Sequence, residues 1–260
     1  MRIQNTLTKK DIQYIREIQR SNKEFAQFVV EGKKCCYELL SSNYKISYVV
    51  VNKDNKDDKF ISNLITKIIE KQIDIFEVSN SIFSKLSDTI TPQGIIAVVE
   101  KKENDIVLNE PFIVLDNVSD PGNVGTIIRT ADWFGIKQII LLENCAGKYS
   151  SKVVRATMGS LFRIKIKMLN YFQFKQLIDN KKIKLFGAFL DAEQDLRDIK
   201  IKQDEPFGLI VGNEAHGISK EIEEITTNKF KIKGSGQAES LNVGIALGIS
   251  LFHFCNQKNS

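Results

Sequence analysis

Residues 112–131 read FIVLDNVSDPGNVGTIIRTA and carry two structural signals in succession. The run Phe112 to Asp116 is short and apolar, which is typical of a parallel strand buried on both faces of its sheet. A Pro-Gly turn follows, and apolar residues then recur at i, i+3, i+4 and i+7 from Val124. We expect a helix over 123–134 with Asn123 as its N-cap. A buried strand that runs directly into an amphipathic helix predicts an α/β fold.

The same alternation continues on both sides of this stretch. Further buried strands are predicted at Gln138–Leu142, Leu185–Leu190 and Phe207–Gly212, with helices at Tyr171–Lys181 and Leu241–Phe254. The preceding hundred residues also alternate, with predicted helices at 8–20, 33–40 and 60–71 and strands at 28–30, 46–51, 73–78 and 95–99. A charged stretch, 100–105, separates the two regions. We therefore predict a small α/β domain at residues 1–103 and a larger domain with a mostly parallel sheet at residues 104–260.

Composition narrows the class of protein. The chain has 260 residues, 42% of them hydrophobic, and a net charge of 37 − 32 = +5, which permits a polyanionic partner without requiring one. Its longest apolar runs fall far short of the ~18 residues that a membrane span needs. The first residues lack the apolar core of a secretory signal. The four cysteines form no C-x-x-C pair: Cys35, Cys36, Cys145 and Cys255. We expect a reduced, cytoplasmic protein without a membrane partner.

Several familiar catalytic motifs are absent from the sequence. It contains no G-x-G-x-x-G and no G-x-x-x-x-G-K-[ST], which argues against a dinucleotide dehydrogenase and a P-loop NTPase. It contains no H-E-x-x-H, no Cys/His quartet and no G-x-S-x-G either. We expect no metal site.

The helix over 123–134 places one arginine away from its apolar stripe. Arg129 has Gly125 four residues before it and Thr126 one turn earlier. A guanidinium beside a small residue leaves room for a ligand to approach. The competing interpretation, favoured by spacing alone, is a surface arginine on an ordinary crossover helix.

A second segment, FGLIVGNEAHGI at 207–218, ends a buried strand in polar residues. Ligands of open α/β sheets bind at the carboxyl ends of strands. Gly212 permits close backbone approach, and Glu214 supplies a carboxylate at that edge. His216 has no Ser or Cys nucleophile paired with it by pattern, and we favour a loop histidine without a chemical role. We expect His253, which lies among apolar residues of the last helix, to be a packing residue or a satisfied polar group.

A third segment, FKIKGSGQAESLNVG at 230–244, passes from a strand through a glycine-rich loop into the last helix. Ser240 is a plausible N-cap, and a helix start can hold a polar ligand edge. Gly244 and Gly248 lie one turn apart, so another element can pack closely there. The alternative is a glycine-rich turn without a ligand.

Positive charge is concentrated in residues 144–178, which contain seven basic residues and no acidic one. Such a run suits binding to a phosphate backbone, although a solvated surface is an equally good interpretation. The seven residues are Lys148, Lys152, Arg155, Arg163, Lys165, Lys167 and Lys175.

Together, the three segments resemble the three signature motifs of the SpoU (TrmH-type) RNA 2′-O-ribose methyltransferases, which belong to the trefoil-knotted SPOUT class. The matching stretches are PGNVGTIIRTA at 121–131, GNEAHGI at 212–218 and SLNV at 240–243. The first hundred residues resemble the small substrate-binding domain of that family, with VEGK at 30–33 and LS to TPQGI between 86 and 95 as landmarks. The resemblance covers nearly the whole chain.

The resemblance implies an enzyme that transfers a methyl group from S-adenosylmethionine to a ribose 2′-hydroxyl. It implies a deep trefoil knot, a homodimer, and RNA as substrate, ribosomal RNA rather than transfer RNA because of the front domain. The catalytic positions carried over are Arg129, Asn123, Glu214, Ser240 and Asn242. The cofactor positions carried over are Gly212, Ile232 and Leu241, largely through backbone atoms. We add Lys148, Lys152, Arg155, Arg163 and Lys165 as expected RNA contacts.

Two alternatives stay open at this point. One is a transfer-RNA 2′-O-ribose methyltransferase, and the other is an inactive RNA-binding or ribosome-assembly protein of the same fold. Keeping all five catalytic positions argues against the inactive protein. The chain departs from the family at Lys233-Gly234, where Pro-Met is frequent, so the packing of this loop on the adenosine is in doubt.

Overall fold

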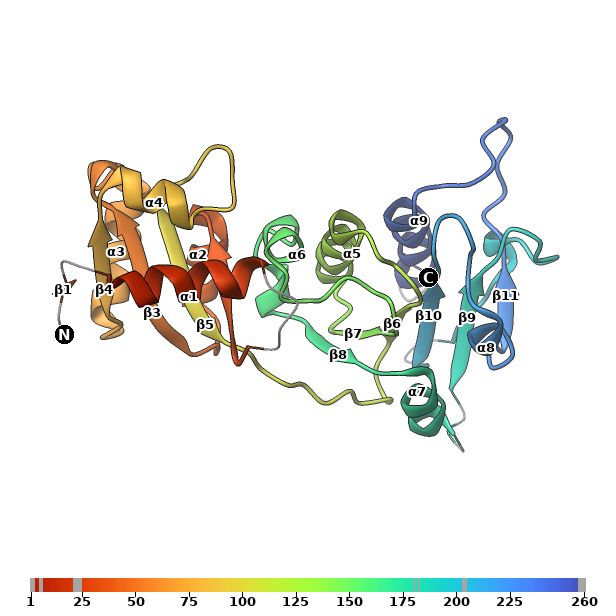
Figure 1. The fold of residues 1–260 in the computed structure, drawn as a ribbon. Coiled ribbons are helices and arrows are strands. Elements are labelled where there is room, and N and C mark those ends of the chain that lie inside the picture. The colour runs from red at the N-terminus through yellow and green to blue at the C-terminus, as the bar shows by residue number, and fades with distance from the viewer. Residues whose placement is uncertain are drawn as a thin grey trace. The chain divides into compact units, whose positions relative to one another are not determined.

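The computed structural model describes residues 3–4, 7–20, 25–179, 181, 183–202 and 205–256. The chain forms two compact units, drawn in Figure 1. Unit 1 comprises Met1–Lys102 and Lys148–Phe162, and unit 2 comprises Glu103–Gly147 and Arg163–Ser260. The first change of unit falls inside the charged stretch 100–105. Residues 148–162 pack with unit 1, whereas the sequence predicted one continuous domain over 104–260.

Unit 1 is a five-stranded mixed sheet with helices packed around it. The strand order is β1-β4-β3-β5-β2, in which β1, β4 and β3 run parallel and β5 is antiparallel to both of its neighbours. The strands are β1 (Ile3–Gln4), β2 (Gln27–Glu31), β3 (Ile46–Asn52), β4 (Ile75–Val78) and β5 (Ile95–Glu100). The helices are α1 (Lys9–Arg20), α2 (Lys33–Leu40), α3 (Lys59–Glu70), α4 (Asn80–Leu86) and α6 (Ser151–Ala156), with short 3₁₀ turns η1 (Lys53–Asn55) and η2 (Ser160–Phe162).

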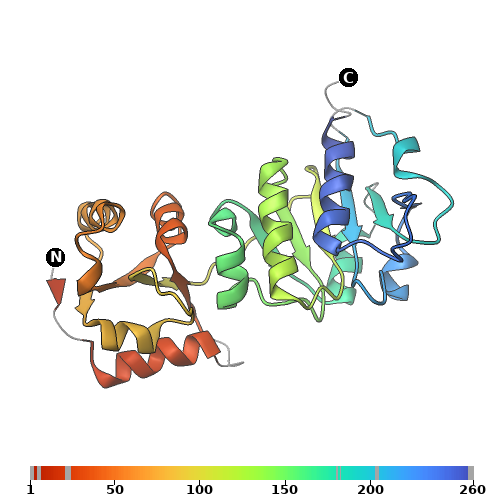
Figure 2. The same ribbon diagram turned by 90° about the horizontal axis from the view of Figure 1, so that it is seen from above.

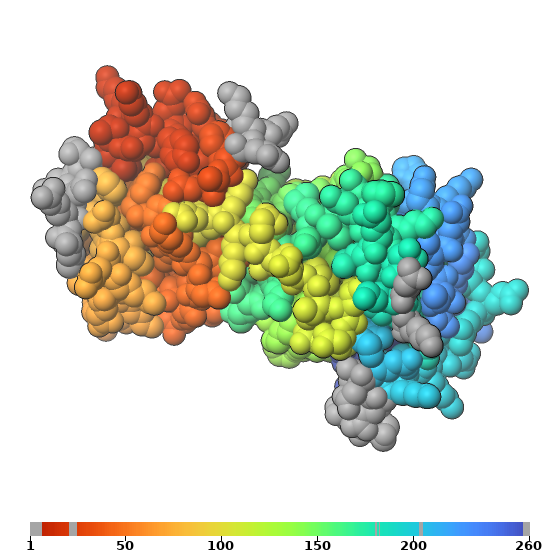
Figure 3. Space-filling view, turned by 90° about the horizontal axis from the view of Figure 1, so that it is seen from below, coloured from red at the N-terminus to blue at the C-terminus, as the bar shows by residue number. Residues whose placement is uncertain are grey.

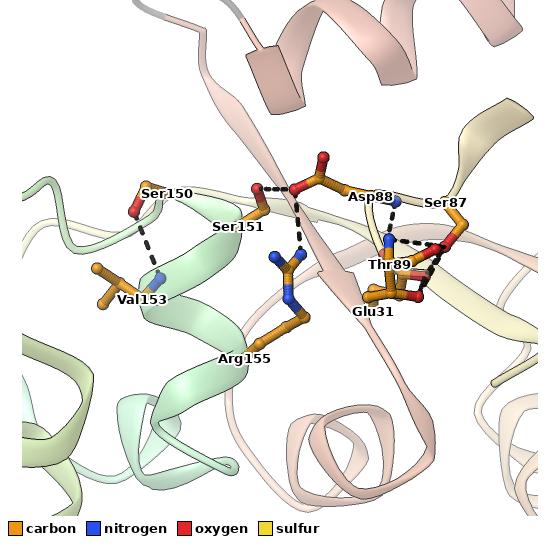
Figure 4. A network of polar contacts seen from close by, with 8 residues as sticks. All are labelled: Glu31, Ser87, Asp88, Thr89, Ser150, Ser151, Val153 and Arg155. Atoms are coloured by element: carbon orange, nitrogen blue, oxygen red, sulfur yellow. Dashed lines mark hydrogen bonds and ion pairs between the residues drawn. The ribbon is translucent and has the colours of Figure 1, made fainter. Parts of the chain in front are cut away.

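A buried carboxylate joins the two sequence landmarks of unit 1 (Figure 4). Glu31 is only 4% exposed, and its side chain accepts hydrogen bonds from the Ser87 hydroxyl, from the Asp88 N–H at 3.1 Å and from the Thr89 hydroxyl at 3.1 Å. A buried charge is tolerated where it is hydrogen-bonded in this way. The network therefore ties the end of β2 to the loop that follows α4.

The same network holds α6 in unit 1. The Asp88 carboxylate accepts hydrogen bonds from the Ser151 hydroxyl at 2.9 Å and from the Arg155 guanidinium at 3.2 Å (Figure 4). The Phe28 and Tyr149 rings lie 4.3 Å apart between centroids, and Val153 and Val154 are buried. These contacts explain why residues 148–162 pack with unit 1, although the residues before and after them in the sequence belong to unit 2.

Unit 2 is built on a six-stranded sheet in which every pairing is parallel, as the unbroken apolar runs predicted. The order is β11-β9-β10-β6-β7-β8. The strands are β6 (Phe112–Leu115), β7 (Gln138–Leu141), β8 (Lys165–Met168), β9 (Lys184–Ala188), β10 (Phe207–Val211) and β11 (Asn228–Phe230). The helices are α5 (Pro121–Trp133), α7 (Tyr171–Ile178), α8 (Lys220–Glu223) and α9 (Val243–Asn256), with a 3₁₀ turn η3 (Leu196–Asp198).

The strand order of unit 2 reverses beside β6. The chain proceeds from β6 to β7 and β8 on one side and then places β9, β10 and β11 on the other. A crevice at the carboxyl ends of the strands is expected at such a switch point. The loops that follow β6 and β10 are therefore the natural place for a ligand site.

Helices α5 and α9 lie side by side on one face of this sheet (Figures 1 and 2). Two glycines of α9 face α5, as the sequence predicted. A Cβ at Gly244 would lie 3.2 Å from the Thr126 methyl, and one at Gly248 would lie 3.8 Å from the Thr130 methyl. The small residues let the starts of the two helices approach closely.

Residues 103–110 run along the surface of unit 2 (Figure 3). The segment is fixed to β7, because the Gln138 side chain exchanges two hydrogen bonds with the Val107 backbone at 2.7 and 2.8 Å.

No helix within the described residues is long and apolar enough to cross a bilayer.

Candidate active site

The first turn of α5 places Asn123 at the sheet edge. Asp120 is the N-cap, and its side chain accepts the Asn123 N–H at 2.8 Å. Pro121 occupies the first turn, where its missing N–H costs nothing. The prediction of Asn123 as N-cap is therefore wrong by three residues. Since Asp120 caps the helix, the Asn123 side chain is available for other contacts.

Three side chains from the three motifs meet here. The Asn123 amide nitrogen donates to the Glu214 carboxylate, and the Asn242 amide nitrogen donates to Asn123 Oδ1 at 2.9 Å. Asn123 is half-buried, while Glu214 and Asn242 are exposed. We call these residues the polar trio. Residues 119 positions apart thus converge on one edge of the sheet, which is where a ligand of this fold class binds.

Asn242 also starts the last helix. Its Oδ1 accepts the N–H groups of Gly244 at 3.0 Å and Ile245 at 3.4 Å, and α9 begins at Val243. The predicted cap at Ser240 is therefore wrong. Ser240 is exposed and has no hydrogen-bond partner within the described part of the chain. A single amide of Asn242 both caps α9 and orients Asn123.

Glu214 is carried on a tight turn that only glycine can close. Asn213 and Gly217 exchange backbone hydrogen bonds at 3.0 and 2.9 Å, and Gly217 has a φ of 70°. A Cβ at Gly212 would lie 2.2 Å from the Gly217 carbonyl oxygen, which is a severe overlap. The expected need for glycine at 212 thus has a direct geometric cause.

Arg129 lies apart from the polar trio. It is exposed on α5, and no hydrogen bond or ion pair engages its guanidinium among the described residues. It lies six positions after Asn123 in the helix, a rise of about 9 Å along the axis. Glu214 accepts its hydrogen bond from Asn123 and not from Arg129. Arg129 therefore presents a cation on α5 that none of the described residues engages.

Two of the predicted cofactor positions lie at the two ends of the loop between β11 and α9. Ile232 is half-buried, and Leu241 is 42% exposed. Gly234 and Gly236, in the loop between them, have open space where a Cβ would be. This loop therefore presents accessible backbone and an exposed apolar side chain, which suits a flat heterocycle held through main-chain atoms. Lys233-Gly234 leaves that surface accessible.

A buried carboxylate lies beneath this edge, and sequence reasoning missed it. Asp116 is fully buried and accepts hydrogen bonds from the Ser219 N–H at 2.6 Å, the Tyr171 hydroxyl at 3.0 Å and Asn117 Nδ2 at 3.2 Å. Burial raises the pKa of Tyr171, which keeps its hydroxyl a donor. Asp116 ends the quoted strand, so its position at the carboxyl end was the available signal.

The basic run does not form one surface. Lys148 is 4% exposed, so the expectation that it contacts RNA is wrong. Arg155 is paired with Asp88 and Arg163 with Asp132, which lowers their capacity for a phosphate partner. Lys152 and Lys165 are exposed, and neither has an ion-pair partner within the described residues. Lys152 belongs to unit 1 and Lys165 to unit 2.

Two family models match the chain. The model described as the SpoU rRNA Methylase family matches residues 110–252. The model described as RNA 2′-O ribose methyltransferase substrate binding matches residues 29–105. The first contains the polar trio, and the second contains the Glu31 network.

Relatives match along most of the chain. The 23S rRNA (guanosine(2553)-2′-O)-methyltransferase RlmP of Bacillus subtilis is 31% identical over 226 residues, 87% of each chain. An AdoMet-bound rRNA methyltransferase from Sinorhizobium meliloti superposes with a TM-score of 0.83 at 30% identity, covering 97% of this chain and 96% of that one. A TrmH-family protein from Porphyromonas gingivalis gives a TM-score of 0.85 at 32% identity, covering 98% and 100%.

Proposed function

The chain belongs to the SpoU rRNA methylase family, and we propose on that premise that it methylates a ribose 2′-hydroxyl of ribosomal RNA. The methyl donor is S-adenosylmethionine. The observation that carries the proposal is the polar trio, because three distant motifs of the family converge in it. A ribosomal substrate implies a cytoplasmic protein.

We propose that the cofactor lies between the Gly212 turn and the loop that leads to Leu241. When bound, it supplies an electrophilic methyl group on a sulfonium. Gly212 keeps the turn narrow, since any side chain there would overlap the Gly217 carbonyl. The exposed Leu241 side chain and the main chain near Ile232 offer the remaining surface.

The chain's own contribution is to hold and orient the sugar hydroxyl. One Glu214 oxygen is occupied by Asn123, and the other has no partner within the described residues, so it can accept the hydroxyl hydrogen bond. Arg129 contributes a guanidinium, which is a poor base, and so acts as an electrostatic partner of the developing oxyanion. Alignment of hydroxyl and methyl provides much of the rate.

We propose that unit 1 binds the RNA around the target. It contains residues 29–105, which match the substrate-binding model, and its Glu31 network fixes the loop after α4. Lys152 and Lys165 are the members of the basic run that we retain as RNA contacts.

We also propose a homodimer. The α9 helix exposes Ile245 at 56%, Ile249 at 39% and Phe252 at 62%, on one side of the helix. Exposed apolar patches of this kind mark contact surfaces. A second copy of the chain is the occupant we propose for it.

The test is methyl transfer from labelled S-adenosylmethionine to total RNA, followed by separation of ribosomal and transfer RNA. We expect label in ribosomal RNA with the wild type and at least ~100-fold slower transfer with Arg129→Ala, because a transition-state contact is lost. Binding of S-adenosylhomocysteine, measured by calorimetry, should be unchanged. Lys175→Ala, an exposed lysine of α7, is the control.

Three results would contradict the proposal. Label confined to transfer RNA would favour the transfer-RNA alternative. No transfer by well-folded wild type would favour the inactive alternative. Equal transfer by Arg129→Ala and wild type would remove Arg129 from the mechanism.

A further inference from the structure

A second polar feature lies beside the polar trio and has no part in it. A pocket of about 320 Å³ opens at the carboxyl ends of β10, β6 and β7. Its lining includes Asn117, Ser119, Asn144, Asn213 and His216. None of these side chains is a lysine, arginine or carboxylate. The volume is within the range of small-ligand sites.

One wall of this pocket is held rigidly. Asn117 Nδ2 donates to the Tyr171 hydroxyl at 2.9 Å, and its Oδ1 accepts from Asn144 Nδ2 at 2.9 Å. Asn213 Nδ2 donates to the Asn117 carbonyl oxygen at 3.1 Å, and its Oδ1 accepts the Ala215 N–H at 2.8 Å. The buried Asp116 side chain accepts a further hydrogen bond from Asn117 Nδ2 at 3.2 Å. Burying a carboxylate costs free energy. The buried Asp116 therefore indicates that this side of the pocket is held in a fixed geometry.

The residues that line the pocket also carry unused hydrogen-bonding groups. Asn144 Oδ1, His216 Nε2 and the Ser119 hydroxyl have no partner among the described residues, although all three residues line the pocket. His216 Nδ1 lies 3.3 Å from Asn213 Oδ1, which leaves the far nitrogen of the ring available. The free groups are amide, hydroxyl and imidazole atoms. They suit the edge of a neutral polar ring, whereas a phosphate would call for guanidinium or ammonium groups.

The pocket and the polar trio share their loops. The loop after β6 carries Ser119 and then Asp120, which caps the turn that holds Asn123. The loop after β10 carries Asn213 and then Glu214 in consecutive positions. A nucleotide whose sugar reaches the polar trio therefore has a pocket for its base on the same two loops.

We propose that this pocket receives the base of the nucleotide whose ribose is methylated, and that Asn144 and His216 read the hydrogen-bonding edge of that base. The proposal rests on the proposed function. Bases of structured RNA are recognised when they are unstacked and their edges are exposed. The rigid amide wall then positions the ring, and the free groups discriminate between bases.

The experiment uses the full-length protein and transcripts of 23S rRNA. The methylated nucleotide is first mapped by primer extension, and four transcripts are made that differ only in the base at that position. The measured quantity is the ratio of kcat/KM between the best base and the others. The variants are Asn144→Ala, His216→Ala and their combination, with Asn109→Ala as an exposed asparagine of the same unit outside the pocket.

We expect the wild type and Asn109→Ala to prefer one base, and the double variant to lose about tenfold or more of that preference. His216→Gln should restore part of it, because it returns a polar atom near the same place. Affinity for S-adenosylhomocysteine should be unchanged in all variants. Loss of folding would be seen as a lowered melting temperature, and the single variants then decide the question.

Unchanged base preference in active variants would overturn the proposal. Weakened binding of S-adenosylhomocysteine with preference intact would assign the pocket to the cofactor and overturn it as well. Absence of methyl transfer by the wild type would instead refute the proposed function, so the two failures are distinct.

Discussion

At the residue scale, the site depends on the asparagine amide, which carries a donor and an acceptor on one rigid group. Asn242 uses its oxygen for the α9 backbone and its nitrogen for Asn123. Asn123 in turn uses its nitrogen for Glu214. Each asparagine donates to the next residue, so the hydrogen bonds run from Asn242 to Asn123 and end on the Glu214 carboxylate. An aspartate at either position would lack the amide donor and so would break one of these hydrogen bonds.

Two substitutions of Asn242 distinguish its effect on the stability of α9 from its effect on the active site. Asn242→Ala should lower the unfolding free energy by about 1 kcal/mol, because the cap is lost. Asn242→Asp should keep the stability, because aspartate caps equally well, but should reduce methyl transfer since it cannot donate to Asn123. Urea unfolding and transfer rates measured on both variants check this. Equal activity of Asn242→Asp and wild type would exclude a role for this link.

The sequence predicts these residues only in part. The family motifs singled out Asn123, Glu214 and Asn242, and all three meet. The caps were misplaced because Asp120 and Asn123, like Ser240 and Asn242, are equally good caps in pattern, and only the backbone distinguishes them. Lys148 is buried by tertiary packing that a run of charges does not reveal.

At the element scale, the long apolar runs were predictable and the short elements were not. Strands β6 and β10 end one residue before their predicted ends, and α2 has the predicted bounds. Helices α4 and α6 were missed because they have only seven and six residues, too few for a clear period. Strand β8 was hidden by its lysines, since an edge strand exposes alternate residues.

The contact between α5 and α9 gives a prediction for stability. Gly248→Ala should raise the unfolding free energy by about 0.5–1 kcal/mol, because its Cβ would have ordinary contact distance and alanine favours the helix. Gly212→Ala should lower it, since its Cβ would overlap the Gly217 carbonyl. Urea unfolding of the two variants checks both signs. A destabilised Gly248→Ala would mean that the helices pack more closely than described.

At the scale of the whole molecule, each unit contains a thiol with a raised pKa: Cys35 is buried and Cys145 is half-buried. Burial raises the pKa of Cys35 in unit 1 and of Cys145 in unit 2 to about 11. The folded chain therefore keeps these protons at a pH where the unfolded chain releases them. This contribution is complete below the unfolded pKa of about 8.5 and is lost as pH rises toward 11.

We expect the unfolding free energy to fall between pH 9 and pH 11, by at most about 1.4 kcal/mol per pH unit for each thiol. Cys145→Ala should flatten this fall, because one titrating group is removed. Urea unfolding at several pH values measures the slope for both proteins. Parallel curves for the variant and the wild type would show that Cys145 is not protected.

The proposed dimer can be tested by a substitution among the exposed apolar residues of α9. Ile249→Asp should yield a monomer, because a carboxylate would be desolvated in the contact. Ile90→Asp, at a fully exposed apolar residue of unit 1, serves as the control. Light scattering after size-exclusion chromatography measures the mass. A monomeric wild type, or a dimeric Ile249→Asp, would refute the assignment.

Because residues 148–162 pack with unit 1, the two units cannot be prepared as separate fragments by cutting the chain once. A truncated chain starting at residue 104 would keep Val153, Val154 and Leu161 but lose β2 and α2, which bury them, and would be prone to aggregate. A fragment ending at residue 103 would leave Asp88 without its arginine. No single cut yields two intact pieces, so the division of labour between RNA capture and methyl transfer has to be examined by point substitution.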